Sequence, residues 1–174
     1  MTKHAIRKPK AYKGERTWPE ILEATGPLIN FLESVSNQVA AKWRGSVPPS
    51  IYGVTVDGRE VATAIQREGR RDVPEVPEGL PWAMILHGHL ETEFGPLAAR
   101  VAVVEAWAVN DLDGLPDVRP REHPARKEVV ILEAACPSGK LHGMRDIIRK
   151  NGKAMLGPLW IAERDGVRGD ENIQ

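Results

Sequence analysis

The residues best suited to chemistry in this sequence are two histidines and two glutamates that recur at every second position. His87, His89, Glu91 and Glu93 belong to the apolar segment 82–109, WAMILHGHLETEFGPLAARVAVVEAWAV. If this part of the segment is a strand, a spacing of two places all four side chains on one face. Neutral imidazoles and a carboxylate held on one face suit Zn, Mn or Fe. The pattern therefore predicts a metal site of His87, His89 and Glu91, as in a metal-dependent hydrolase.

A second interpretation of the same residues involves no metal. Polar residues that alternate with apolar ones are also typical of a strand with one solvated face. On this interpretation a Gly95–Pro96 turn sets Glu91 opposite Arg100, and the two form a cross-strand ion pair. We favour this second interpretation, and we expect no cofactor; a divalent metal enters only with the hydrolase alternative.

Glu105 is the candidate for a catalytic acid. It stands between Val103 and Trp107, on the strand face that we expect to line the core. Burying a charged carboxylate costs free energy unless the carboxylate is paired. Buried carboxylates often act as general acids. The competing interpretation is a structural ion pair with Arg149 or Lys127.

Basic residues are concentrated in two segments. Residues 1–16 hold six Lys or Arg and one acid, whereas the whole chain has a net charge of zero. A second basic segment, 119–127, is stiffened by prolines and has no aromatic residue to stack on bases. These segments are candidates for binding nucleic acid or an acidic partner. Their residues are Lys3, Arg7, Lys8, Lys10, Lys13, Arg119, Arg121, Arg126 and Lys127.

Composition excludes several classes of protein. The chain has 174 residues, of which 41% are hydrophobic, so it suffices for one domain with a core. No apolar run approaches the ~20 residues of a membrane span, and no apolar segment follows the basic arm as in a signal peptide. The single cysteine, Cys136, excludes an intramolecular disulfide. We expect a cytoplasmic or intracellular protein, or a virion protein if it is a phage component, without membrane partners.

Periodicity predicts the first elements. Thr17 to Glu20 form a capping box, and the segment 27–44 carries apolar residues at spacings of three and four, which predicts an amphipathic helix. These residues are Leu28, Phe31, Leu32, Val35, Val39 and Trp43. A strand is expected over 51–56. Two predictions compete for the segment 59–68. It is either a helix, which we favour because its residues are good helix formers, or the return strand of a hairpin that turns at Asp57–Gly58.

The second half of the chain is expected to supply most of the sheet. Residues 82–94 and 97–109 form a hairpin, 127–135 a third strand and 156–162 a last one. Between these, the spacing of Met144, Ile147 and Ile148 predicts a helix over 141–150 that ends at Asn151–Gly152. The proline-rich segments 69–81 and 110–126 are loops.

These elements predict a single α+β domain over 17–163, with a basic arm at 1–16 and a polar tail at 164–174. The domain holds an antiparallel sheet of three or four strands, with helices mainly on one face. Because no motif for nucleotide binding or for a common hydrolase is present, we predict a non-enzymatic interaction or assembly module, such as a phage-type or intracellular oligomeric component. The metal-dependent hydrolase and a nucleic-acid accessory protein are the alternatives. The expected partner is a second copy or another protein, bound through a half-apolar sheet face with Ile85, Ala102, Val104 and Ala106.

Overall fold

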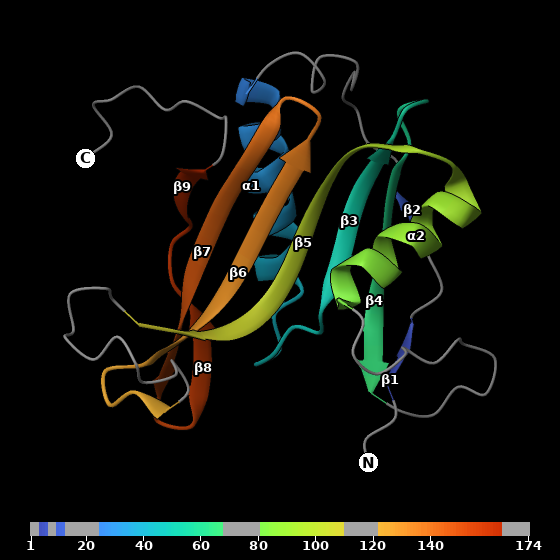
Figure 1. Cartoon of the computed structure of the whole chain (residues 1–174). Coiled ribbons are helices and arrows are strands. Elements are labelled where there is room, and N and C mark those ends of the chain that lie inside the picture. The colour runs from blue at the N-terminus through green and yellow to red at the C-terminus, as the bar shows by residue number, and fades with distance from the viewer. Residues whose placement is uncertain (1–3, 7–9, 13–24, 68–80, 110–121, 165–174) are drawn as a thin grey trace.

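The computed structural model describes residues 4–6, 10–12, 25–67, 81–109 and 122–164 (Figure 1). Several predictions fall outside these residues: the capping box at 17–20, most of the expected loops 69–81 and 110–126, and nearly all of the tail at 164–174. The same is true of the basic residues Lys3, Arg7, Lys8, Lys13, Arg119 and Arg121. The elements are two helices, α1 (Thr25–Ala41) and α2 (Trp82–Phe94), and the strands β1 (His4–Ile6), β2 (Lys10–Tyr12), β3 (Ser50–Thr55), β4 (Glu60–Arg67), β5 (Leu97–Ala108), β6 (Lys127–Cys136), β7 (Gly139–Lys150), β8 (Lys153–Leu156) and β9 (Trp160–Arg164).

The strands form one antiparallel sheet in the order β1-β4-β3-β5-β6-β7-β8. In addition, β2 pairs with β4, and β9 pairs with β7. The predicted combination of helices with an antiparallel sheet is confirmed, but the prediction of three or four strands is wrong. The sheet is larger although 82–94, expected as a strand, is a helix. The segments 59–68 and 141–150, for which we favoured helices, contain strands, and β1 and β2 of the basic arm also join the sheet.

The two helices pack on opposite faces of the sheet, so the prediction that helices lie mainly on one face is also wrong (Figure 1). Helix α1 covers β5, β6 and β7, and its buried apolar side chains belong to the predicted stripe, including Leu28, Leu32 and Val35. The expected helix over 27–44 is therefore confirmed. Helix α2 packs through Leu86 and Leu90 on residues of β3, β4 and β5. We call the two sides of the sheet the α1 face and the α2 face.

Successive side chains of β6 and β7 point to opposite faces of the sheet, so every second residue of these strands lies on the α1 face. Val130, Leu132 and Ala134 of β6 are buried on the α1 face. Opposite Leu132 lies Gly143 of β7, and a Cβ on Gly143 would come within 3.2 Å of Leu32 in α1. A side chain at position 143 would therefore require Leu32 to shift by a few tenths of an ångström.

Turn geometry explains why the segments 59–68 and 141–150 are strands. The β3–β4 turn contains Gly58 with φ of +88°, and the β7–β8 turn contains Asn151 and Gly152 with φ of +51° and +74°. Two consecutive residues with positive φ make a hairpin turn whose twist matches that of the strands, and Asn-Gly favours it strongly. The dipeptide that we expected to end a helix thus connects two strands.

Residues 82–94 form a helix, which corrects the predicted first strand of the central hairpin. Leu86 and Leu90 are fully buried four residues apart, which is the spacing of one helix face. The helix has no side-chain cap at Pro81 and no acidic residue in its first turn. The expected strands at 127–135 and 156–162 are confirmed as β6 and, in part, as β8 and β9. Neither described helix is long and apolar enough to cross a membrane.

Candidate functional site

The predicted metal ligands lie on a helix rather than on a strand. His87, His89 and Glu91 all belong to α2. A helix advances about 100° per residue, so His89 lies roughly 200° around the axis from His87, whereas Glu91 follows His87 on the same face. Within the described parts of the chain, no group of three or more His, Cys, Asp or Glu residues is arranged to hold a metal. The prediction that these three side chains share a face is wrong.

His87 instead joins the helix to the sheet. Its Nε2 lies 3.1 Å from Oε1 of Glu91, and its Nδ1 lies 3.3 Å from Nη1 of Arg100 in β5. Because a guanidinium can only donate, Nδ1 accepts from Arg100 and Nε2–H donates to Glu91. Glu91 Oε1 also accepts from the backbone N–H of Leu97, at 3.3 Å. The expected pairing of Glu91 with Arg100 is therefore indirect, and the imidazole bridges the two residues.

Glu105 has a structural partner. It lies on the α1 face of β5, where its Oε1 accepts a hydrogen bond from the backbone N–H of Val47. This contact holds the segment between α1 and β3 against the sheet. The negative charge of Glu105 also contributes to raising the pKa of Arg149, although the hydrogen bond of Arg149 with Glu128 is the largest cause.

The described parts of the two basic segments belong to strands that are not neighbours in the sheet. Strands β1 and β2 of the N-terminal arm pair with β4, whereas Arg126 and Lys127 lie at the start of β6 (Figure 1). The guanidinium of Arg126 lies 5.0 Å from the centre of the Trp107 ring, and Lys127 Nζ lies 3.8 Å from Oδ2 of Asp146. The described residues therefore do not bring the arm and the 119–127 segment together as one basic surface.

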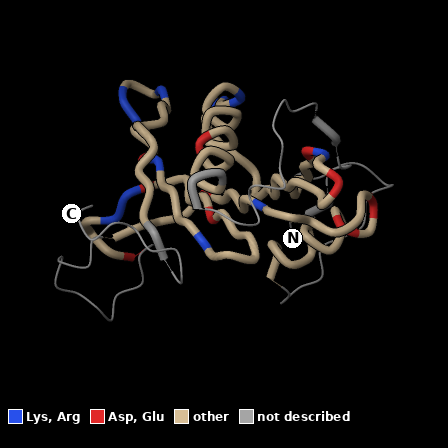
Figure 2. The backbone as a smooth tube through the Cα atoms, turned by 90° about the horizontal axis from the view of Figure 1, so that it is seen from above, with Lys and Arg blue, Asp and Glu red and all other residues tan. Residues whose placement is uncertain are grey.

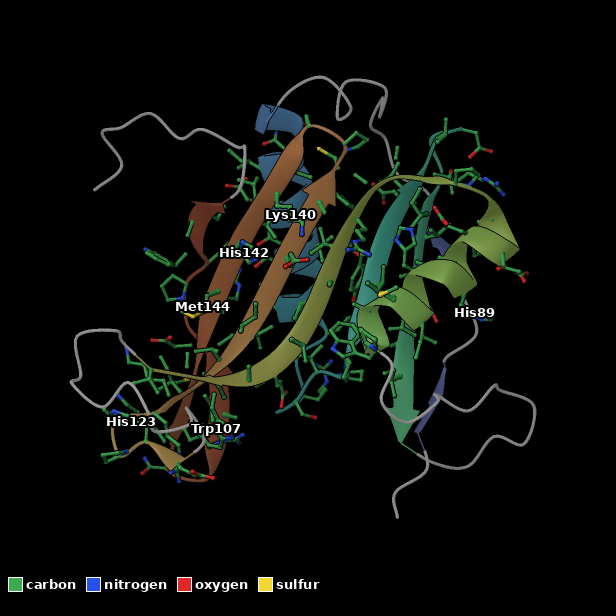
Figure 3. All side chains as sticks on the ribbon, in the orientation of Figure 1. His89, Trp107, His123, Lys140, His142 and Met144 are labelled. Atoms are coloured by element: carbon green, nitrogen blue, oxygen red, sulfur yellow. The ribbon has the colours of Figure 1, made fainter. Side chains whose placement is uncertain are left out.

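The described helices leave a part of the α2 face uncovered, because α2 lies over β3 and β4 and does not extend across β6 and β7 (Figure 1). We call this part the open face; it is formed by β6, β7, β8 and β9 and borders the second half of β5. Figure 3 shows Lys140, His142 and Met144 following one another along β7 on this side. The register places Trp160 beside Met144, and Met155 beside Ile148.

Large apolar side chains are exposed on the open face. Relative exposures are 63% for Trp160, 51% for Met155 and 38% for Ile148, and Met144 beside Trp160 is partly buried. Of the residues expected to form an uncovered apolar face, Val104 and Ala106 border it and are half-buried. Ala102 is instead buried in the cluster under α2, and Ile85 belongs to that helix.

The ionisable groups of the open face are largely paired with one another. His142 Nε2 lies 3.1 Å from Oε2 of Glu133, and Asp146 pairs with Lys127. Each of these two carboxylates thus has a partner on the open face. The other ring nitrogen of His142, Nδ1, is buried and has no hydrogen-bond partner among the residues that the structure describes.

Sequence reasoning missed this surface because it assigned 141–150 to a helix. The signal was present, since Leu141, Gly143, Arg145 and Ile147 alternate with His142, Met144, Asp146 and Ile148 before an Asn-Gly turn. A shallow depression on the outer side of α1 has, among its described lining residues, Glu33 as its only ionisable group. The open face is therefore the best candidate for a functional surface, because large apolar side chains are exposed on it.

Comparison of the chain with protein-family models, with curated proteins and with solved structures finds no match in any of the three.

Proposed function

We propose that this protein is a non-enzymatic assembly module that binds another protein chain, and first of all a second copy of itself, through the open face. The observation that supports this proposal is that large apolar side chains are exposed at two places on one face of the sheet. Ile148 and Met155 lie beside each other, and Trp160 lies beside Met144 farther along β7. An exposed cluster of large apolar side chains is unfavourable in water and is typical of an interaction surface.

The composition of the surface favours a protein as its partner. Trp and Met are enriched in protein–protein interfaces, where a large aromatic ring often carries much of the binding free energy. Glu133 is hydrogen-bonded with His142, and Asp146 pairs with Lys127, so neither carboxylate is left without a partner when an apolar surface covers this face. A strongly single-signed surface would instead favour a charged ligand.

The proposal is tested by measuring the mass of the purified protein by light scattering over about a hundredfold range of concentration. We expect the mass to rise above that of the 19.2 kDa monomer as the concentration increases. Trp160→Ser should weaken the association at least about tenfold, because it removes the most exposed aromatic side chain of the open face.

Met84→Ser is the matched control. Met84 is 66% exposed but lies on α2, outside the open face, so its replacement should leave the association unchanged. A wild-type protein that stays at 19.2 kDa throughout the range would contradict the proposed function. Equal association constants for the wild type and Trp160→Ser would show that the open face is not the surface used.

A further inference from the structure

The two ends of the sheet carry opposite charges. Among the described residues, segments 122–128 and 145–155 hold six Lys or Arg and three Asp or Glu, whereas segments 56–60 and 87–100 hold two Arg and four Asp or Glu. Figure 2 shows the Lys and Arg positions at the β7–β8 end, and several Asp and Glu positions around α2 on the opposite side. We call these the basic end and the acidic end.

The basic end is continuous with the open face. Lys150 and Lys153 are directly opposite each other in the β7–β8 hairpin, immediately after the pair Ile148 and Met155. Side chains two residues apart in a strand share a face, so both lysines lie on the same side as the exposed apolar residues. Like charges directly opposite in a sheet are destabilising. Neither lysine has an ion pair within the described residues, so the hairpin gains nothing internally from this arrangement.

The acidic end offers a complementary surface. Glu93 is exposed in the last turn of α2 and has no ion pair within the described part of the chain. Val56 lies in the neighbouring β3–β4 turn, is 62% exposed, and its backbone N–H donates to the carbonyl of Pro96 just after α2. An exposed apolar side chain thus lies at the end that carries the acids, as Met155 lies at the end that carries the lysines.

We propose that copies of this chain associate head to tail, with the acidic end of one copy seated on the open face and basic end of the next. This inference rests on the proposed function and names its partner and its geometry. A twofold arrangement in which the basic ends meet would bring four lysines, two from each copy, close together, and like charges facing each other across an interface are unfavourable. Head-to-tail contact places the basic end of each copy, with Lys150 and Lys153, against the acidic end of the next copy. Such contacts generate rings or open filaments.

The test uses charge reversal in the full chain. Lys150→Glu with Lys153→Glu reverses the charge of the basic end. Because two glutamates repel each other as two lysines do, the like-charge repulsion within the hairpin is the same as in the wild type. Thr92→Lys with Glu93→Lys reverses the acidic end, where lysines also suit the helix C-terminus. Each pair of substitutions should weaken the association at least about tenfold, as measured by sedimentation velocity at low salt. Raising the salt should weaken the wild-type association.

The chain that carries all four substitutions decides the geometry. Its ends are again opposite in charge, so head-to-tail contact predicts that the fourfold variant associates to within about threefold of the wild type at low salt. Each variant's fold is checked by circular dichroism. A fourfold variant that remains as weak as the two double variants would overturn the proposal, as would a wild type that forms only a closed dimer.

Two further outcomes separate this inference from the proposed function. If Trp160→Ser abolishes the association but charge reversal does not change it, the open face is an interface in a different arrangement, and only the head-to-tail geometry is wrong. If the wild type stays monomeric and instead binds duplex DNA through Lys150 and Lys153, the basic end binds a polyanion and not a second copy, and both proposals are wrong.

Discussion

The close approach of α1 to β7 gives a quantitative test of the fold. Leu32 is fully buried at the centre of α1, and its Cδ2 would lie 3.2 Å from a Cβ added at Gly143. Because Gly143 has no side chain that can move into the space left by Leu32, Leu32→Ala should cost about 3–5 kcal/mol of the free energy of unfolding. Gly143→Ala adds a methyl group against Leu32 and Leu159, which costs about 1–3 kcal/mol, partly offset by the lower chain entropy of alanine.

The double variant Leu32→Ala with Gly143→Ala measures whether the two positions touch. The added methyl group enters the space that the leucine vacates, so the double variant should be about 1–2 kcal/mol more stable than the sum of the two single effects predicts. The free energy of unfolding is obtained from urea melts, with equal slopes confirming that the unfolded states are comparable.

The control for this cycle is Leu28→Ala with Gly143→Ala. Leu28 is equally buried and lies one turn before Leu32, but it is not among the nearest side-chain neighbours of Gly143. Its effect should add to that of Gly143→Ala to within about 0.5 kcal/mol. Additive effects for Leu32 and Gly143 would refute the packing of α1 on β7 described above.

Three other changes have expected outcomes. Glu105→Ala should lower the free energy of unfolding by about 1–3 kcal/mol in urea melts, because it leaves the Val47 N–H without its acceptor, and Glu105→Gln should restore most of the loss. Gly152→Ala should cost about 1–2 kcal/mol, because its φ of +74° is unfavourable for a residue with a Cβ, and an equally stable variant would contradict the assigned turn. The Arg149 guanidinium holds the pKa of the Glu128 carboxyl below its ordinary value of 4.5, so this pair stabilises the fold above that pH and the contribution is lost as the pH falls through the lowered value. Glu128→Gln should therefore show a smaller difference in stability between about pH 7 and about pH 3 than the wild type, and an unchanged difference would show that the pair does not contribute.

The sequence alone identified those elements whose residue pattern fits only one type of secondary structure. The stripe that includes Leu28, Leu32 and Val35 has helical spacing over several turns, and α1 covers most of the expected range. The segment of β6 is rich in β-branched residues and was predicted correctly for the same kind of reason. The antiparallel nature of the sheet followed from short connections between successive strands.

Two segments were predicted wrongly because the spacing of their apolar residues fits both a strand and a helix. In 82–94, Leu86 and Leu90 are four residues apart, a spacing that belongs both to a strand face and to a helix face. The histidines at every second position favoured the strand, and no cap marked the helix start. In 141–150, Met144, Ile147 and Ile148 have helical spacing, but only Ile147 is buried, because β7 presents alternate residues to α1.

The candidate functional surface depended most on tertiary structure. Whether Met144, Ile148, Met155 and Trp160 lie together is decided by the pairing of β7 with β8 and β9, and local propensity does not encode which strands become neighbours. Their exposure depends further on where α2 ends across the sheet. The chain's sequence determined that a helix would cover one apolar face, because a periodic stripe must be buried. Only the tertiary structure decided which part of the other face stays open to solvent, because that depends on how far a second helix of 13 residues reaches over a sheet much wider than itself.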